Sequence, residues 1–148
     1  MKILLIEDTP QKAEKIKNAI LQHFSDTNVD IKGSYQSGNE ALENKEYDLI
    51  LLDMTIPMYD YDQEPNEPLP KLGFMLFNEI RRQQISTKII VISQFSDFKS
   101  KGEEEQTLEE LTQEMKNKFD NFLCSIFYAQ NNTAWETQLI NHITNLKK

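Results

Sequence analysis

Two short segments of this chain are almost continuously aliphatic, and each one stops at acidic residues. The first covers residues 2–6 and is followed by Glu7 and Asp8, and the second covers residues 47–52 and is followed by Asp53. Strands that are buried on both faces of a parallel sheet have this composition, whereas half-exposed strands alternate between apolar and polar residues. The pattern therefore predicts a parallel sheet that is covered by helices on both sides.

Predicted strands and helices alternate along the chain. The strands are predicted at residues 2–6, 29–35, 47–52, 88–93 and 122–129. The helices are predicted at residues 10–24, at a short segment opened by a capping box from Ser37 to Glu40, at 73–82, at 103–119, and after a second capping box from Thr133 to Glu136. Residues 57–72 hold four of the five prolines and are expected to form an irregular loop. This alternation is typical of a doubly wound α/β domain.

The bulk properties limit the classes of function. A chain of 148 residues is expected to form one domain, over residues 1–148. Its net charge of −8 argues against nucleic acid as the main partner, because phosphate binding is driven by lysine and arginine. Cys124 is the only cysteine, so an intramolecular disulfide is excluded. Because the sequence has no signal-peptide pattern and no apolar run of membrane-spanning length, we expect a cytoplasmic protein without a membrane partner.

The acidic residues that follow the two aliphatic strands indicate a metal site. Ligands of such sheets bind outside the carboxyl ends of the strands, where Glu7, Asp8 and Asp53 are expected to converge. Three adjacent carboxylates repel one another unless a hard cation holds them, and oxygen ligands are what Mg²⁺ prefers. An aspartate beside a metal can also act as a nucleophile toward a phosphoryl group, and Ser93 at a neighbouring strand end could then bind a phosphate oxygen.

This arrangement resembles the receiver domain of two-component response regulators. The matching residues are Ile6-Glu7-Asp8 after the first strand, Leu52-Asp53-Met-Thr-Ile-Pro57 after the third, and Val-Ile-Ser93 at the end of the fourth. The resemblance covers essentially the whole chain. It implies a flavodoxin-like sheet of five parallel strands in the order 2-1-3-4-5, with helices on both faces.

The resemblance also implies the role of each site residue. Asp53 would be the phosphoacceptor, and Ser93 would be the switch hydroxyl that follows the phosphate. The magnesium ligands would be Glu7, Asp8, Asp53 and the backbone carbonyl of Thr55. The partners would be a histidine kinase or phosphotransfer protein and an unknown downstream protein, and a homodimer is possible. Such a phosphoprotein is not an enzyme in the metabolic sense, because its activity is limited to self-phosphorylation from a donor and self-dephosphorylation.

The sequence departs from the family at the fifth strand, which normally ends in a lysine. No lysine occurs between Lys118 and Lys147, and the residue at the family position is Phe127 or Tyr128. Lys99 or Lys101, in the loop after Ser93, could supply the missing charge. The loop after Pro57 and the segment between Ser93 and the fifth strand are also longer than the family usually has.

Two hypotheses of function follow from these features. The first is a single-domain receiver in phosphorelay signal transduction, which accepts a phosphoryl group on Asp53 with Mg²⁺ and signals by protein–protein interaction. The second is a degenerate receiver that binds a partner without phosphorylation. The missing lysine favours the second, and the intact acidic residues favour the first. A hydrolase with an aspartate nucleophile is disfavoured because Thr55 stands where such an enzyme needs a second aspartate.

Overall fold

The computed structural model describes residues 1–61, 66–94, 97–98 and 106–148, and of residues 97, 98 and 106 it defines the backbone alone. The strands are β1 (Lys2–Ile6), β2 (Asn28–Lys32), β3 (Leu49–Leu52), β4 (Lys88–Ser93), β5 (Asp97–Phe98), β6 (Gln106–Thr107) and β7 (Phe122–Phe127). The helices are α1 (Pro10–His23), α2 (Tyr35–Asn44), α3 (Lys71–Arg82), α4 (Leu108–Lys118) and α5 (Ala134–Lys147). β1 and β4 have the predicted bounds, whereas β2, β3 and β7 are shorter than predicted.

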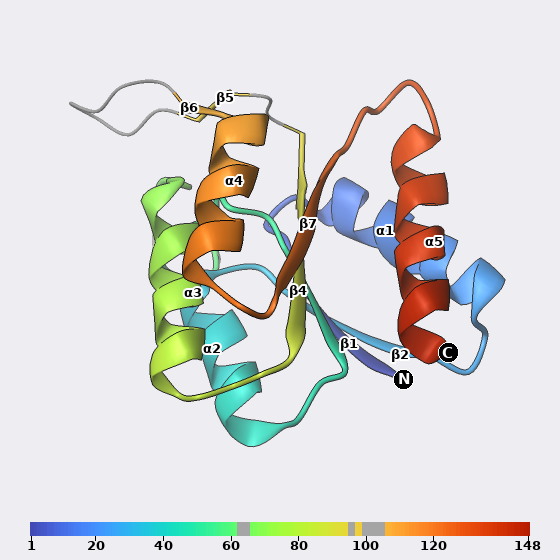
Figure 1. The fold of residues 1–148 in the computed structure, drawn as a ribbon, viewed down its shortest axis with the longest axis horizontal. Helices are drawn as coiled ribbons and strands as arrows, with labels where there is room; N and C mark the ends of the chain where they lie inside the picture. The colour runs from blue at the N-terminus through green and yellow to red at the C-terminus, as the bar shows by residue number, and fades with distance from the viewer. Residues whose placement is uncertain (62–65, 95–96, 99–105) are drawn as a thin grey trace.

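Five strands form one parallel sheet in the order β2-β1-β3-β4-β7. Because β7 is the fifth strand of this sheet, the order is 2-1-3-4-5, and the predicted flavodoxin-like α/β fold is confirmed. Helices α1 and α5 cover one face, and α2, α3 and α4 cover the other (Figure 1). β5 and β6 form a separate antiparallel pair near α4. Within the described residues, no helix is both long and apolar enough to cross a membrane.

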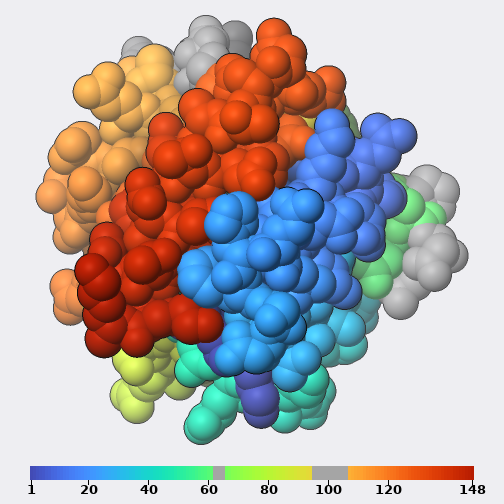
Figure 2. All heavy atoms as spheres, turned by 90° about the vertical axis from the view of Figure 1, so that its right-hand side faces the viewer, coloured from blue at the N-terminus to red at the C-terminus, as the bar shows by residue number. Residues whose placement is uncertain are grey.

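The sheet has a hydrophobic core on each face. Successive side chains of a strand point to opposite faces, so β1 contributes Ile3 and Leu5 to the core beneath α1 and α5. Leu4 and Ile6 enter the core beneath α2, α3 and α4. All four are fully buried, which explains the absence of polar residues between them. Figure 2 shows α1 and α5 packed side by side, and these two helices cover the core that contains Ile3 and Leu5.

The predicted start of α2 is wrong. The helix begins at Tyr35 rather than after a capping box from Ser37 to Glu40, and Ser34 is its N-cap. Ser34 Oγ accepts a hydrogen bond from the Ser37 backbone nitrogen at 3.1 Å, and Ser37 Oγ accepts one from the Ser34 nitrogen at 3.2 Å. The Tyr35 nitrogen donates to the carbonyl of Pro57 at 2.9 Å. The helix start therefore depends on a loop that is distant in the sequence.

The predicted start of α4 is also wrong. Gln106 and Thr107 form β6, and the helix begins at Leu108, while residues 103–105 lie outside the described part of the chain. Thr107 Oγ1 accepts a hydrogen bond from the Glu110 nitrogen at 3.1 Å and completes a capping box. Because a hydroxyl cap satisfies an otherwise unpaired amide of the first turn, it defines the helix start more sharply than the preceding acidic residues do.

The capping box predicted at the start of α5 does not form. Thr133 is the N-cap residue, as predicted, but its side chain makes no capping hydrogen bond to the helix, and the predicted pairing with Glu136 is wrong. The side-chain oxygen of Asn132 instead accepts a hydrogen bond from the Ala134 nitrogen at 3.1 Å. The preceding residue therefore satisfies the first amide of this helix.

Candidate functional site

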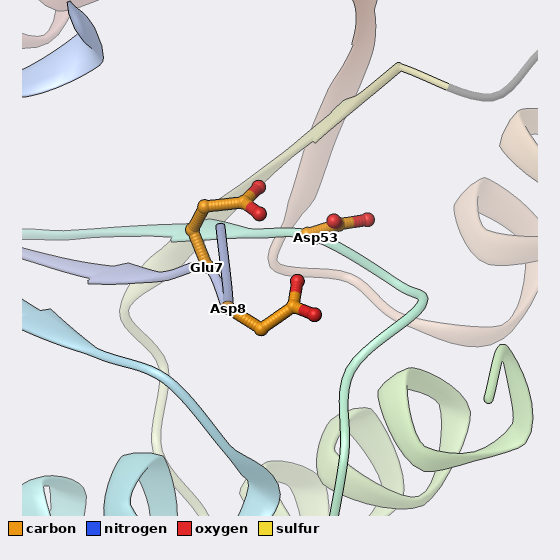
Figure 3. Close-up of side chains that lie close together, drawn as sticks. All are labelled: Glu7, Asp8 and Asp53. Carbon is orange, nitrogen blue, oxygen red and sulfur yellow. The ribbon is translucent and has the colours of Figure 1, made fainter. Parts of the chain in front are cut away.

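The carboxylates that follow two separate strands meet at one edge of the sheet. β1 and β3 are neighbours with Ile6 opposite Leu52, so Glu7 and Asp53 leave the sheet next to each other. The Asp53 nitrogen donates to the Ile6 carbonyl at 3.0 Å. One carboxylate oxygen from each of Glu7, Asp8 and Asp53 lies within 4.8 Å of the others. Figure 3 shows these three side chains, which we call the acidic cluster, pointing toward a common space.

Burial makes the negative charges of the acidic cluster costly. Glu7 and Asp53 are each 2% exposed, and Asp8 is half-buried. Desolvation raises the pKa of all three carboxyl groups, and repulsion from Asp53 raises the pKa of Glu7 further. Charged carboxylates in this position require nearby positive charge. The cluster therefore has the electrostatics of a cation site.

The site contains a lysine that the sequence analysis missed. Lys12 lies in the first turn of α1, its side chain is only 2% exposed, and its ammonium is 2.6 Å from Glu7 Oε1 and 3.5 Å from Asp53 Oδ2. It also donates a hydrogen bond to the carbonyl of Ile92 at 3.2 Å. One signal was available: Lys12 lies four residues before Ile16, on the apolar face of its helix, where a charged residue is unusual.

The carboxyl ends of β4 and β7 form the other side of the site. Ser93 ends β4 and is fully buried, and its carbonyl accepts a hydrogen bond from the Tyr128 nitrogen at 2.7 Å. The Tyr128 side chain is 3% exposed, and its ring centroid lies 5.4 Å from the Lys12 ammonium. Phe127 is 47% exposed. Of the two residues considered for the family's lysine position, Tyr128 is the one that faces the site.

The segment after β3 lies over the acidic cluster. The Thr55 nitrogen donates to Asp53 Oδ1 at 3.2 Å, and the hydroxyl of Tyr61 donates to Asp8 Oδ2 at 2.7 Å. This hydrogen bond to Tyr61 opposes the rise in the pKa of Asp8. Lys99 and Lys101, the candidate substitutes for the missing lysine, lie outside the described residues. The described loop therefore contributes a phenol hydroxyl to the cluster, a contact that the sequence analysis did not anticipate.

Comparison with known proteins identifies the family. The chain matches the response regulator receiver domain model over residues 3–108, and it belongs to that family. The uncharacterized protein y4jR of Sinorhizobium fredii is 28% identical over 145 residues, which are 95% of each chain. The Detocs response regulatory protein DtcB of Enterobacter cloacae is 28% identical over 152 residues, which cover 99% of this chain and all of that protein.

Solved structures support the same fold at lower identity. A two-component response regulator from Clostridium difficile is 14% identical, with a TM-score of 0.67 over 99% of this chain and 95% of that one. The response regulator TrrA from Thermotoga maritima, solved in complex with Mg²⁺–BeF, is 16% identical, with a TM-score of 0.63 over 98% of this chain and 97% of that one. At these identities the similarity concerns the fold.

Proposed function

We propose that this receiver accepts a phosphoryl group on Asp53 with Mg²⁺ and signals by protein–protein interaction in a phosphorelay. The observation that supports this most strongly is the acidic cluster, whose oxygens lie within 4.8 Å of one another at the carboxyl edge of the sheet. The similarity to DtcB, which is named a response regulatory protein, supports the same class. In this proposal residues 1–148 act as one receiver domain.

The donor set suits Mg²⁺. All the side-chain ligands are carboxylate oxygens, which a hard divalent cation prefers. Among the described residues, three ionised carboxylates beside one ammonium, that of Lys12, leave a formal surplus of two negative charges, which one divalent cation would balance. Glu7, Asp8, Asp53 and the carbonyl of Thr55 are the proposed ligands. When bound, the metal would neutralise charge on the phosphoryl group during transfer.

The chain's own residues provide the acceptor and its surroundings. A carboxylate oxygen of Asp53 would form a bond to phosphorus while the bond from phosphorus to the donor's imidazole nitrogen breaks and leaves its electron pair on that nitrogen. The Thr55 nitrogen orients Asp53 through its hydrogen bond to Oδ1. Ser93, which is buried at the adjacent strand end, is proposed to donate a hydrogen bond to a phosphoryl oxygen.

The proposed partners follow from this chemistry. A histidine kinase or a phosphotransfer protein would supply the phosphoryl group, and an unidentified protein would bind the phosphorylated form in the cytoplasm. Phosphorylation would shift an equilibrium between two conformations, and dimerisation is one form that this shift could take. Catalysis by the chain itself would be limited to taking the phosphoryl group from its donor and releasing it to water.

A second candidate function is a degenerate receiver that binds its partner without phosphorylation. The observation that favours it is the absence of any lysine between Lys118 and Lys147, the stretch that contains β7, where the family carries one. In that case the ion pairs of Lys12 would simply neutralise a site that no longer accepts phosphate. The two candidates predict opposite results when the protein is given a phosphoryl donor.

Intact-mass analysis after incubation with Mg²⁺ and acetyl phosphate distinguishes the two. We expect the mass of one phosphoryl group to be added to the wild-type protein and not to Asp53→Asn. Binding of beryllofluoride, a phosphoryl mimic, provides a test that needs no specific kinase. Mg²⁺ binding without either phosphoryl uptake or beryllofluoride binding would support the phosphorylation-independent module instead.

A further inference from the structure

We infer that Lys12 replaces the lysine missing from the fifth sheet strand, and that it pairs with the phosphoryl group on Asp53 from helix α1. This inference rests on the proposed phosphoryl acceptance. In this inference, the positive charge that balances the phosphoryl group comes from helix α1 and not from the fifth strand of the sheet. The inference also explains why a chain without the usual lysine keeps all three acidic residues.

The position of the ammonium carries the argument. It lies 2.6 Å from Glu7 after β1, 3.5 Å from Asp53 after β3, and 3.2 Å from the carbonyl of Ile92 in β4. Lys12 therefore contacts residues at the carboxyl ends of three adjacent strands, beside the proposed phosphoacceptor. Among the ion pairs of the described residues, no other lysine or arginine pairs with a carboxylate of the acidic cluster.

The geometry of α1 explains how its lysine reaches the strand ends. Lys12 is the third residue of the helix, which begins at Pro10. The bonds from Cα to Cβ tilt toward the N-terminus of a helix, so this side chain extends back toward the end of β1 rather than along α1. A lysine in the sheet is therefore not required to place an ammonium here.

The Tyr128 ring lies beside the Lys12 ammonium. The Tyr128 ring faces the ammonium on one side, and its centroid lies 5.0 Å from that of Trp135. An aromatic ring can stabilise a neighbouring cation but cannot itself carry the positive charge. Trp135 packs against Tyr128, and the Tyr128 ring in turn contacts the Lys12 ammonium. The ring therefore stabilises this ammonium where a lysine of the strand would otherwise extend.

A buried lysine without a charged partner is rare, because removing an ammonium from water is costly. In the unphosphorylated protein, Glu7 and Asp53 compensate this cost. With Mg²⁺ held by the carboxylates and a phosphoryl group on Asp53, the phosphoryl oxygens become the anionic partner of the same ammonium. Lys12 forms no covalent bond in this exchange of partners, so it acts as a counter-ion.

The variant Lys12→Met tests this role, and Lys15→Met is the matched control because Lys15 is an exposed lysine of the same helix. Trp135, the single tryptophan, packs on Tyr128 and can report binding of Mg²⁺ and then of beryllofluoride by fluorescence. Loss of a hydrogen bond to a charged group predicts that beryllofluoride binds Lys12→Met about 10- to 100-fold more weakly. Mg²⁺ alone should bind at least as tightly as in the wild type, because a competing positive charge is gone.

Phosphoryl uptake from acetyl phosphate, followed by intact mass, should slow by about the same factor in Lys12→Met and remain unchanged in Lys15→Met. Beryllofluoride affinity and uptake within twofold of the wild type in Lys12→Met would overturn the inference and leave Lys12 as a counter-ion of the unphosphorylated site only. Failure of the wild-type protein itself to bind beryllofluoride or take up phosphate would instead refute the proposed function, and the inference with it.

A second variant separates loss of charge from damage to α1. Lys12→Met combined with Tyr128→Lys returns an ammonium to the site from the end of β7, where the family normally has it. We expect this double variant to recover most of the beryllofluoride affinity that Lys12→Met loses. If it binds Mg²⁺ like the wild type but recovers no beryllofluoride affinity, the charge of Lys12 is not the property that matters and the inference fails.

Discussion

The substitution Gly73→Ala tests how closely helix α3 must approach the end of β3, the strand that Asp53 follows. Gly73 is the third residue of α3, and its nitrogen donates to the Met54 carbonyl at 3.1 Å. A Cβ atom at Gly73 would lie 2.5 Å from both the Cα and the carbonyl oxygen of Met54. Met54 directly follows Asp53 and precedes Thr55, so any displacement is transmitted to the proposed metal site.

The size of the effect can be worked from these distances. Ordinary contacts of a Cβ atom begin at 3.4 Å, so α3 and the end of β3 must separate by about 1 Å. Overpacking of a tight core costs about 1–3 kcal/mol, and the upper end applies because the atoms in contact are backbone. Alanine regains about 1 kcal/mol over glycine inside a helix. We therefore expect a net loss of about 2 kcal/mol in the free energy of unfolding.

Gly38→Ala is the matched control, because Gly38 also lies inside a helix but faces a side chain. Its Cβ would lie 2.8 Å from Ile6 Cδ1, which can move by a rotamer change. Urea unfolding should show a clearly smaller loss for Gly38→Ala than for Gly73→Ala, and only Gly73→Ala should also weaken Mg²⁺ binding. Equal stability of Gly73→Ala and the wild type would refute the claim that the close contact with Met54 positions the site.

Three further predictions concern the metal, a buried hydrogen bond and a helix cap. Mg²⁺ at about 100 times its dissociation constant should raise the free energy of unfolding by about 2.7 kcal/mol, and EDTA should remove this gain. Thermal unfolding should show a much smaller gain from Mg²⁺ for Asp8→Asn than for the wild type. An equal gain in the two proteins would exclude Asp8 as a ligand. The Tyr47 hydroxyl donates to Asp30 at 2.7 Å, which lowers the pKa of Asp30, while burial and this carboxylate raise the pKa of Tyr47 to about 12. Because that pKa is raised above the ordinary value of 10, the stabilisation is complete below pH 10 and is lost as the pH rises toward about 12. Tyr47→Phe should therefore cost about 1 kcal/mol in urea unfolding at neutral pH, and a difference that persists at high pH would contradict this reasoning. Thr107→Ala removes the hydrogen bond to the Glu110 nitrogen and should cost about 1 kcal/mol, and Thr107→Ser should retain most of the stability.

The sequence by itself was sufficient to predict the sheet and the acidic cluster. The aliphatic segments that form β1 and β3 need both faces buried, and this requirement is visible in a few consecutive residues. Once the strands are parallel, the residues that follow them must lie at one edge. Glu7, Asp8 and Asp53 could therefore be brought together by topology alone, without knowledge of any side-chain contact.

Only the tertiary structure showed which lysine pairs with the acidic cluster and where several elements begin. Lys12 is distant in sequence from Asp53 and Ile92, and its role depends on the packing of α1 against the strand ends. The start of α2 depends on a carbonyl from the loop after β3. The choice between Phe127 and Tyr128 depends on which ring is buried beside Lys12 of α1. These features follow from contacts between distant segments, whereas the strand pattern follows from the local requirement to bury apolar side chains.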